Sequence, residues 1–346
     1  MAAIEILKEA DFRRELKASP RPAYLFFGEE DYLKAYAVRL AREVICPDPT
    51  FAAFNEMRID ALDFEPQKLM DSLMPLPMMA DRKLIILSGL NFTAMKKGDL
   101  DELCAILETL NDYDYNLLLV VAQSDALEAG YLPNSPSPLL RRLSEYLAPV
   151  QFERPAPRKL AEWVGKHFAH NGVAASPAFC SSMLDYCGQS MYVLANEVDK
   201  LSFYALSQGK KEATEADMRK VCTPSVEYDA FAFANALMDA RRDLALAILA
   251  DYRLRRIEPI AVLSSILRVF CDMEQIYALQ KNGLPVPSIA AAMKMKEYPV
   301  KLYLRSLNNS SPERLRRAIS ACADADAALK LSPQGYTALE VLVCSV

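Results

Sequence analysis

Glycine is scarce in this sequence, and the glycine-rich motif of many nucleoside triphosphatases is absent. Only ten glycines occur in 346 residues, and none begins a Gly-x-x-x-x-Gly-Lys-Ser/Thr segment. That loop surrounds the phosphates with backbone N–H groups, while its hydroxyl side chain helps to hold magnesium. The apolar run Asn116–Val121 also ends in Ala122 and Gln123, without the carboxylates expected at a magnesium site. We therefore predict that the isolated chain is not an ATPase and has no catalytic residues.

Histidine is almost absent, and the cysteines lack a metal-binding spacing. His167 and His170 are spaced to share one helical face, but the sequence places no further ligands that would complete a tetrahedral site. Eight cysteines occur without a Cys-x-x-Cys pair, which favours reduced, mostly buried thiols over a zinc site or a disulfide framework. We predict neither a bound metal nor a cofactor.

Long apolar runs and an excess of positive charge are missing as well. No apolar run approaches the roughly 18 residues that span a membrane, and acids follow soon after Met1, unlike in a signal peptide. The net charge of −5 argues against strong DNA binding by the chain alone, because such binding depends on many Lys and Arg contacts to phosphates. Short basic clusters fit solvated helix faces. We predict a cytoplasmic protein without membrane contact.

The first part of the chain has the pattern of an α/β domain. Short apolar runs alternate with amphipathic stretches up to about residue 152, which is typical of a parallel sheet covered by helices. The predicted strands are Ala23–Phe27, Phe54–Ile59, Lys83–Leu87, Asn116–Val121 and Val150–Phe152, and the predicted helices are 31–45, 65–72, 99–110 and 138–146. Pro133–Pro138 is predicted to be a turn-rich loop, and nothing in the sequence gives it a function.

Beyond Phe152 the pattern becomes helical, and Cys222–Ser225 divides it again. Helices are predicted at 157–169, 176–186, 190–207, 214–222, 227–238, 242–254, 258–281, 298–307, 311–329 and 334–344, with breaks at Gly283–Pro287 and Asn308–Pro312. The chain is longer than a usual single core. We predict three domains, at residues 1–153, 154–223 and 224–346.

The segment Tyr24–Leu33 places a strand, one glycine and a helix in the order in which α/β proteins often bind phosphate. Its helix begins with three acids, Glu29, Glu30 and Asp31. Their carboxylates suit the positive end of the helix dipole, each contributing about 0.3 to 1 kcal/mol, but they would repel a triphosphate. The first domain is therefore either a nucleotide-binding architecture without a nucleotide site or an ordinary α/β domain with a capped helix.

The segment Leu73–Met79 carries no charge and contains two prolines. The prolines exclude a helix and make the loop stiff, while the methionines supply adaptable apolar surface. The segment is either a buried crossover or a rigid surface for a partner protein. Rigidity suits binding, because each mobile side chain that becomes ordered at an interface costs about 0.5 to 1.5 kcal/mol.

Several segments, in the same order along the chain, resemble the delta subunit of the bacterial DNA polymerase III clamp loader. They are Tyr24–Leu33, Gly188–Tyr204, Glu258–Arg268 and Ala325–Lys330, and the resemblance covers almost the full chain. It implies an α/β plus all-α fold, with an AAA+-type (RecA-like) parallel-sheet domain, a small helical lid domain and a C-terminal helical collar domain.

In that family an apolar element of the first domain inserts into a pocket of the sliding clamp and helps to open the ring. The resemblance matches Leu76, Met78 and Met79 to this element, with Leu73 and Met74 as neighbouring contacts; Met79 stands where an aromatic residue is often found. The family implies a noncatalytic subunit, within a holoenzyme that is a DNA-directed DNA polymerase. Its implied partners are the sliding clamp (beta subunit), the gamma/tau and delta-prime subunits through the collar, and primed DNA in the assembled complex.

Two other functions stay open at this stage. One is a nucleotide-dependent AAA+-type enzyme whose phosphate site has diverged. The other is a helical scaffold that binds DNA directly, which the acidic net charge of −5 disfavours.

Overall fold

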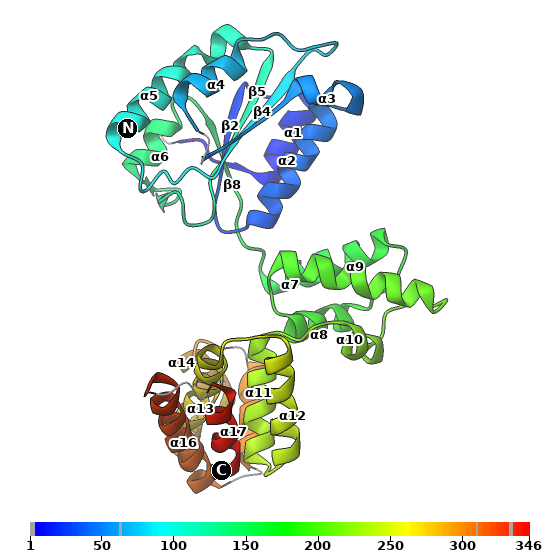
Figure 1. Cartoon of the computed structure of the whole chain (residues 1–346), viewed down its shortest axis with the longest axis vertical. Coiled ribbons are helices and arrows are strands. Elements are labelled where there is room, and N and C mark those ends of the chain that lie inside the picture. Colours follow the sequence, from blue (N-terminus) through cyan, green and yellow to red (C-terminus); the bar gives the residue numbers. More distant parts are fainter. Residues whose placement is uncertain (1–3, 62–63, 296, 309–310, 332–334) are drawn as a thin grey trace. The chain divides into compact units, whose positions relative to one another are not determined.

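The computed structural model describes residues 4–61, 64–295, 297–308, 311–331 and 335–346 (Figure 1). The chain divides into two compact units, Met1–Ala156 and Pro157–Val346. The division into three domains, with boundaries after residues 153 and 223, stays a prediction.

The first unit contains a parallel sheet with the strand order β1-β8-β2-β5-β4-β3. Its strands are β1 (Leu7–Lys8), β2 (Ala23–Phe27), β3 (Glu56–Asp60), β4 (Lys83–Ser88), β5 (Asn116–Val121) and β8 (Ala148–Gln151). The prediction gave β2 and β5 with correct bounds but missed β1, which is too short for a sequence pattern. The predicted strand Phe54–Ile59 begins too early, because Phe54 and Asn55 belong to the preceding helix.

Helices cover both faces of this sheet. They are α1 (Glu9–Ala18), α2 (Asp31–Ile45), α3 (Pro49–Asn55), α4 (Pro66–Leu73), α5 (Lys97–Glu108), the 3-10 helix η2 (Thr109–Tyr113) and α6 (Pro138–Leu143). Side chains alternate along a strand, so Tyr24 and Phe26 of β2 pack with Phe12 of α1, while Leu25 and Phe27 face the opposite core. Figure 1 shows α1 to α3 on one side of the sheet and α4 to α6 on the other.

The predicted loop Pro133–Pro138 contains part of a small antiparallel hairpin. Its strands are β6 (Gly130–Tyr131) and β7 (Ser135–Pro136). Gly130 has a φ of 76°, and a Cβ there would lie 2.6 Å from the Ser135 carbonyl oxygen. The hairpin therefore requires glycine at this position.

Within the described residues of the second unit, all regular secondary structure is helical, apart from one isolated bridge between Ala174 and Glu212. Its helices are α7 (Pro157–His170), α8 (Pro177–Cys187), α9 (Met191–Ser207), α10 (Glu215–Val221), α11 (Val226–Met238), α12 (Arg242–Leu254), α13 (Pro259–Lys281), α14 (Val286–Ala292), α15 (Glu297–Asn308), α16 (Pro312–Leu331) and α17 (Tyr336–Ser345). The members of one buried core all lie between Ala230 and Val346. Among the described helices, none is long and apolar enough to cross a bilayer.

One helix of the second unit lies where the sequence predicts a break. Helix α14 was not predicted, because Val286 and Pro287 were assigned to a break; the proline instead occupies the first turn, where its missing N–H costs no hydrogen bond. The predicted start of the last helix at residue 334, and the middle of the break Asn308–Pro312, lie outside the described residues.

The sheet separates the two segments that the sequence analysis singled out. All its strands are parallel, so they begin at one edge of the sheet and end at the other. The acidic turn at Gly28 follows β2 at the carboxyl edge, while Leu73–Met79 precedes β4 at the amino edge.

Candidate functional site

The turn after β2 is closed by the chain's own groups. Gly28 has a φ of 110°, and a Cβ there would lie 2.5 Å from the Phe152 carbonyl oxygen, so the turn requires glycine. The Glu30 N–H donates to that carbonyl oxygen at 3.2 Å. The Glu30 carboxylate in turn accepts from the Tyr32 N–H at 3.3 Å, and burial raises the pKa of this carboxyl. Two N–H groups at this helix start are thus already bonded within the chain.

The Lys34 side chain fills the space beside this turn. It is 1 % exposed, and its Nζ donates to the carbonyl oxygens of Gly28 at 2.9 Å and Ala122 at 2.7 Å. It also forms an ion pair with Asp31 at 2.6 Å. A nucleotide-binding loop aims a lysine and free N–H groups at phosphate; here the lysine is committed to backbone carbonyls and a carboxylate.

An exposed apolar surface lies at the opposite edge of the sheet. The apolar loop, defined here as residues 74–79, connects α4 toward β4. Its four large side chains are Met74, Leu76, Met78 and Met79, with exposed fractions of 54 %, 76 %, 47 % and 82 %. The segment is therefore not a buried crossover, which was the alternative that the sequence left open.

A buried amide fixes the C-terminal half of the apolar loop. Asn55, the last residue of α3, is 2 % exposed and makes two hydrogen bonds to the backbone of Met78. Its Nδ2 donates to the Met78 carbonyl oxygen at 2.8 Å, and its Oδ1 accepts from the Met78 N–H at 2.7 Å. This pairing imitates a backbone ladder, so the loop has a defined path although it belongs to no strand.

Side chains at the start of β4 and β5 fix the N-terminal half. The buried Lys83 Nζ donates to the carbonyl oxygens of Ser72, at 2.6 Å, and Pro75. The Tyr115 hydroxyl donates to the Met74 carbonyl oxygen at 2.6 Å, and Asn116 Nδ2 donates to that of Leu73 at 3.1 Å. Residues at the beginnings of three adjacent strands thus hold the backbone that presents the apolar side chains.

Burial lowers the pKa of Lys83 to about 8, and we expect its ε-methylene NMR signal to titrate there. An unfolded lysine keeps its proton to about pH 10.5, so stability rises as pH increases from 8 to 10.5, by at most about 1.4 kcal/mol per pH unit. The Lys83→Met variant assigns the signal by removing it. If the Lys83 signal titrated at the same pH as the signals of the surface lysines, the expected lowering of its pKa would be contradicted.

Leu73 does not belong to the exposed surface. Its side chain is 0 % exposed and lies in the core between the sheet and α4 to α6. The sequence prediction that Leu73 shares a contact with a partner is corrected accordingly, because residue 73 ends α4 on the face that packs against the sheet. Met74, Leu76, Met78 and Met79 are placed on the surface.

His167 and one residue in each of two short basic clusters, Arg141–Arg142 and Lys210–Lys211, have structural partners. His167 Nε2 lies 2.8 Å from the Asp199 carboxylate and joins α7 to α9. Arg142 forms an ion pair with Asp101, and Lys210 forms one with Asp217, each at 2.6 Å. Pairing of this kind agrees with the interpretation of these basic residues as ordinary helix and loop surface.

The residues that anchor the apolar loop were not predicted from the sequence. A signal was present, because Lys83 and Asn116 are polar residues directly before the apolar runs Leu84–Leu87 and Leu117–Val121, and Asn55 directly precedes another strand. Burial of a polar side chain at such a position is costly unless the side chain forms hydrogen bonds within the protein. The sequence does not reveal that all three share one partner segment.

Comparison with known proteins places the chain in a family. The family model described as "DNA polymerase III, delta subunit" matches residues 24–130, and "DNA polymerase III delta subunit, C-terminal domain" matches residues 227–346. The chain belongs to the DNA polymerase III delta subunit family. The apolar loop lies within the first matched region, and family membership gives the chain a role in DNA replication.

Individual relatives agree with this assignment. The chain is 20 % identical to the DNA polymerase III subunit delta of Bacillus subtilis over 321 residues, which cover 91 % of this chain and 89 % of the relative. A solved structure, the Bacillus subtilis DNA clamp loader delta protein, matches with a TM-score of 0.56 at 19 % identity and covers 97 % of this chain and 98 % of that one. The fold class predicted from the sequence is confirmed as a parallel-sheet α/β domain followed by helical regions.

Proposed function

We propose that this chain is a noncatalytic clamp-loader subunit that binds a sliding clamp through its apolar loop and helps to open the ring. The observation that carries the proposal is the exposure of Met74, Leu76, Met78 and Met79 on a backbone held by buried polar side chains. Apolar side chains gathered on one exposed segment are typical of protein–protein contact sites. The relative with the similar fold is named a DNA clamp loader delta protein, which supports a clamp as the partner.

The anchored backbone of the apolar loop reduces the conformational entropy that is lost on binding. A flexible loop would lose conformational freedom on association, at a cost of about 1 to 2 kcal/mol for each backbone residue that becomes ordered. Here the hydrogen bonds from Asn55 and Lys83 fix the path of the loop before a partner arrives. More of the free energy of apolar burial is therefore available for affinity.

Such a surface can open a clamp by binding alone, so this chain need not catalyse a reaction. A protein that binds an open ring more tightly than a closed ring shifts the population by that difference in affinity, about 1.4 kcal/mol for each tenfold. We propose that nucleotide hydrolysis by other loader subunits controls when the apolar loop is accessible. The helices of the second unit would join the chain to those gamma/tau-type and delta-prime-type subunits, and primed DNA would be contacted in the assembled complex.

We expect isothermal calorimetry to detect no binding of magnesium-ATP by the isolated chain at millimolar concentrations. The N–H groups of Glu30 and Tyr32 are bonded within the chain, and Lys34 is committed to two carbonyl oxygens. A triphosphate would also meet the carboxylates at the start of α2. Binding at millimolar concentration or tighter would favour the alternative function, a diverged AAA+-type enzyme.

The proposal is tested by mixing the chain with the sliding clamp of the same organism and separating the mixture by size. We expect a stable complex to elute ahead of either protein. Failure of the two proteins to associate would refute the proposed function. Association that disappears at moderate salt would point to charge pairing instead of the apolar loop, since apolar burial is insensitive to screening.

A further inference from the structure

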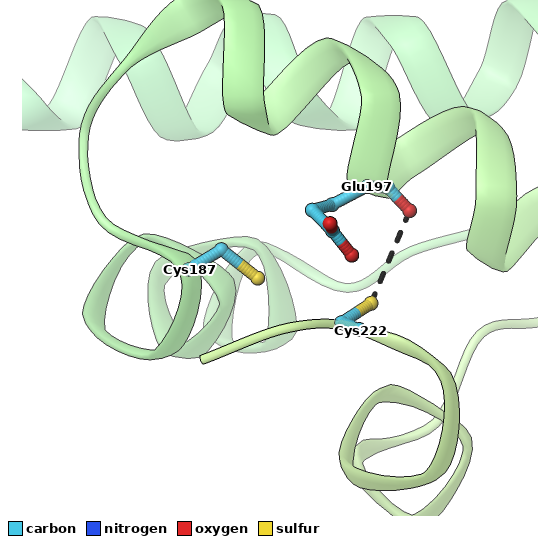
Figure 2. Close-up of side chains that lie close together, drawn as sticks. All are labelled: Cys187, Glu197 and Cys222. Carbon is cyan, nitrogen blue, oxygen red and sulfur yellow. Dashed lines mark hydrogen bonds between the residues drawn. The ribbon is translucent and has the colours of Figure 1, made fainter. Parts of the chain in front are cut away.

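Three potential metal ligands from different helices meet inside the second unit. Cys187 ends α8, Glu197 lies in α9, and Cys222 directly follows α10. Their side chains point toward one another in Figure 2, and their ligand atoms all lie within 4.8 Å of one another. All three residues are buried, and within the described part of the chain no other group of three Cys, His, Asp or Glu side chains is this close.

The chemistry of these side chains suits a zinc-class cation. Two thiolates and one carboxylate are ligands that Zn²⁺ accepts, at distances of about 2.3 Å to sulfur and about 2.0 to 2.2 Å to oxygen. Around a tetrahedral ion, such ligands lie roughly 3.5 to 4 Å from one another. The separations here require only small side-chain movements to reach this arrangement.

The surroundings of Glu197 would balance and orient a bound ion. Lys200 forms an ion pair with the Glu197 carboxylate at 2.7 Å, and the Thr223 N–H donates to the same carboxylate at 3.1 Å. Partners of this kind orient a metal-binding carboxylate. The charges of two thiolates and one carboxylate would be neutralised by a divalent cation together with the Lys200 ammonium.

The cluster also has features of a purely structural contact. The Cys222 Sγ lies 3.9 Å from the Glu197 backbone carbonyl oxygen, the interaction drawn in Figure 2. A hydrogen bond with Cys187 and burial raise the pKa of the Cys222 thiol. Metal binding requires both thiols to lose their protons, whereas protonated thiols can pack against each other without a metal. An experiment therefore has to distinguish these two states.

We propose that Cys187, Glu197 and Cys222 form a binding site for a thiophilic divalent cation of the zinc class. The remaining coordination position would be taken by water or by the second oxygen of Glu197. The ion would join the ends of α8 and α10 to α9, next to the point where the Ser225 N–H donates to the Tyr186 carbonyl oxygen at 2.8 Å. This proposal revises the sequence prediction of no metal site, and it is independent of clamp binding because it involves no residue of the apolar loop.

The test is a titration of the fully reduced, full-length chain with Co²⁺, followed by Zn²⁺. We expect one Co²⁺ per chain, thiolate-to-metal absorption in the near ultraviolet, the visible bands of tetrahedral cobalt, and loss of these signals when Zn²⁺ is added. Cys187→Ser and Cys222→Ser should each weaken binding by at least about 100-fold, and Glu197→Gln by about 10-fold to 100-fold. Cys180→Ser, which changes another buried thiol of α8, should leave the signals unchanged.

A second measurement keeps the test valid if a variant misfolds. Zn²⁺ should raise the melting temperature of the wild-type chain, and a chelator should reverse the increase. The proposal is overturned if the reduced wild-type chain gives no thiolate–cobalt absorption, or if that absorption persists in both Cys187→Ser and Cys222→Ser. It is also overturned if the cysteines only form a disulfide with each other and bind no metal once they are reduced.

Discussion

The chain with Leu76, Met78 and Met79 all replaced by alanine should no longer elute with the sliding clamp. These are three of the four large exposed apolar side chains of the loop, and truncation of a hot-spot side chain at an interface costs about 2 kcal/mol or more. We therefore expect the affinity measured by surface plasmon resonance or calorimetry to fall by at least about 100-fold. Because all three side chains are exposed, the free energy of unfolding should change little.

Two further variants make this result specific to the apolar loop. Tyr131→Ala removes an 87 % exposed aromatic side chain from the β6–β7 hairpin of the same unit and should leave clamp affinity unchanged. Leu73→Ala should instead lower stability by about 2 to 5 kcal/mol, because it leaves a cavity in the core. Undiminished capture of the clamp by the triple variant would remove the site assignment.

Asn55→Ala should weaken clamp binding although it removes none of the apolar contacts. The substitution deletes both hydrogen bonds to Met78 and leaves the Met78 N–H and carbonyl without that partner. We expect stability to fall by about 1 to 3 kcal/mol and clamp affinity to fall by roughly tenfold, since the loop must then become ordered on binding. Hydrogen exchange of the Met78 amide should become faster by a comparable factor.

A double-mutant cycle distinguishes this positioning role from a general loss of stability. If Asn55 acts by placing Met78, then Asn55→Ala should have a much smaller effect on affinity when residue 78 is already alanine. Asn111→Ala changes an exposed asparagine elsewhere in the unit and serves as the control. Equal losses of affinity in both backgrounds would mean that Asn55 does not act through Met78.

Predicted and observed elements agree where the local sequence signals are clear. The bounds of β2, α2, β5 and α12 are as predicted, because apolar runs or helical periodicity coincide there with clear starts and ends. The missed elements are short or depend on distant partners. Helix α3 has seven residues and is too short to be stable alone, and β1 exists only through its pairing with β8.

The candidate site, too, was only partly predictable from local sequence signals. The composition of Leu73–Met79 alone suggested a stiff apolar surface, but it did not distinguish Leu73 from Met74. The last turn of α4 makes this distinction, by turning Leu73 into the core while Met74 is 54 % exposed. Helical geometry, which separates adjacent side chains by about 100°, places the boundary between core and surface within this segment.

The sequence by itself determined the parallel-sheet domain followed by helices, the acidic start of α2 and the uncharged, proline-containing composition of the apolar loop. Those properties depend on neighbouring residues, so they can be read along the chain. Only the tertiary structure decided that Asn55, Lys83 and Asn116 hold that loop, and that Cys187, Glu197 and Cys222 meet. Both arrangements join residues of different helices, strands and loops, and their proximity arises from strand order and helix packing, which no local pattern records.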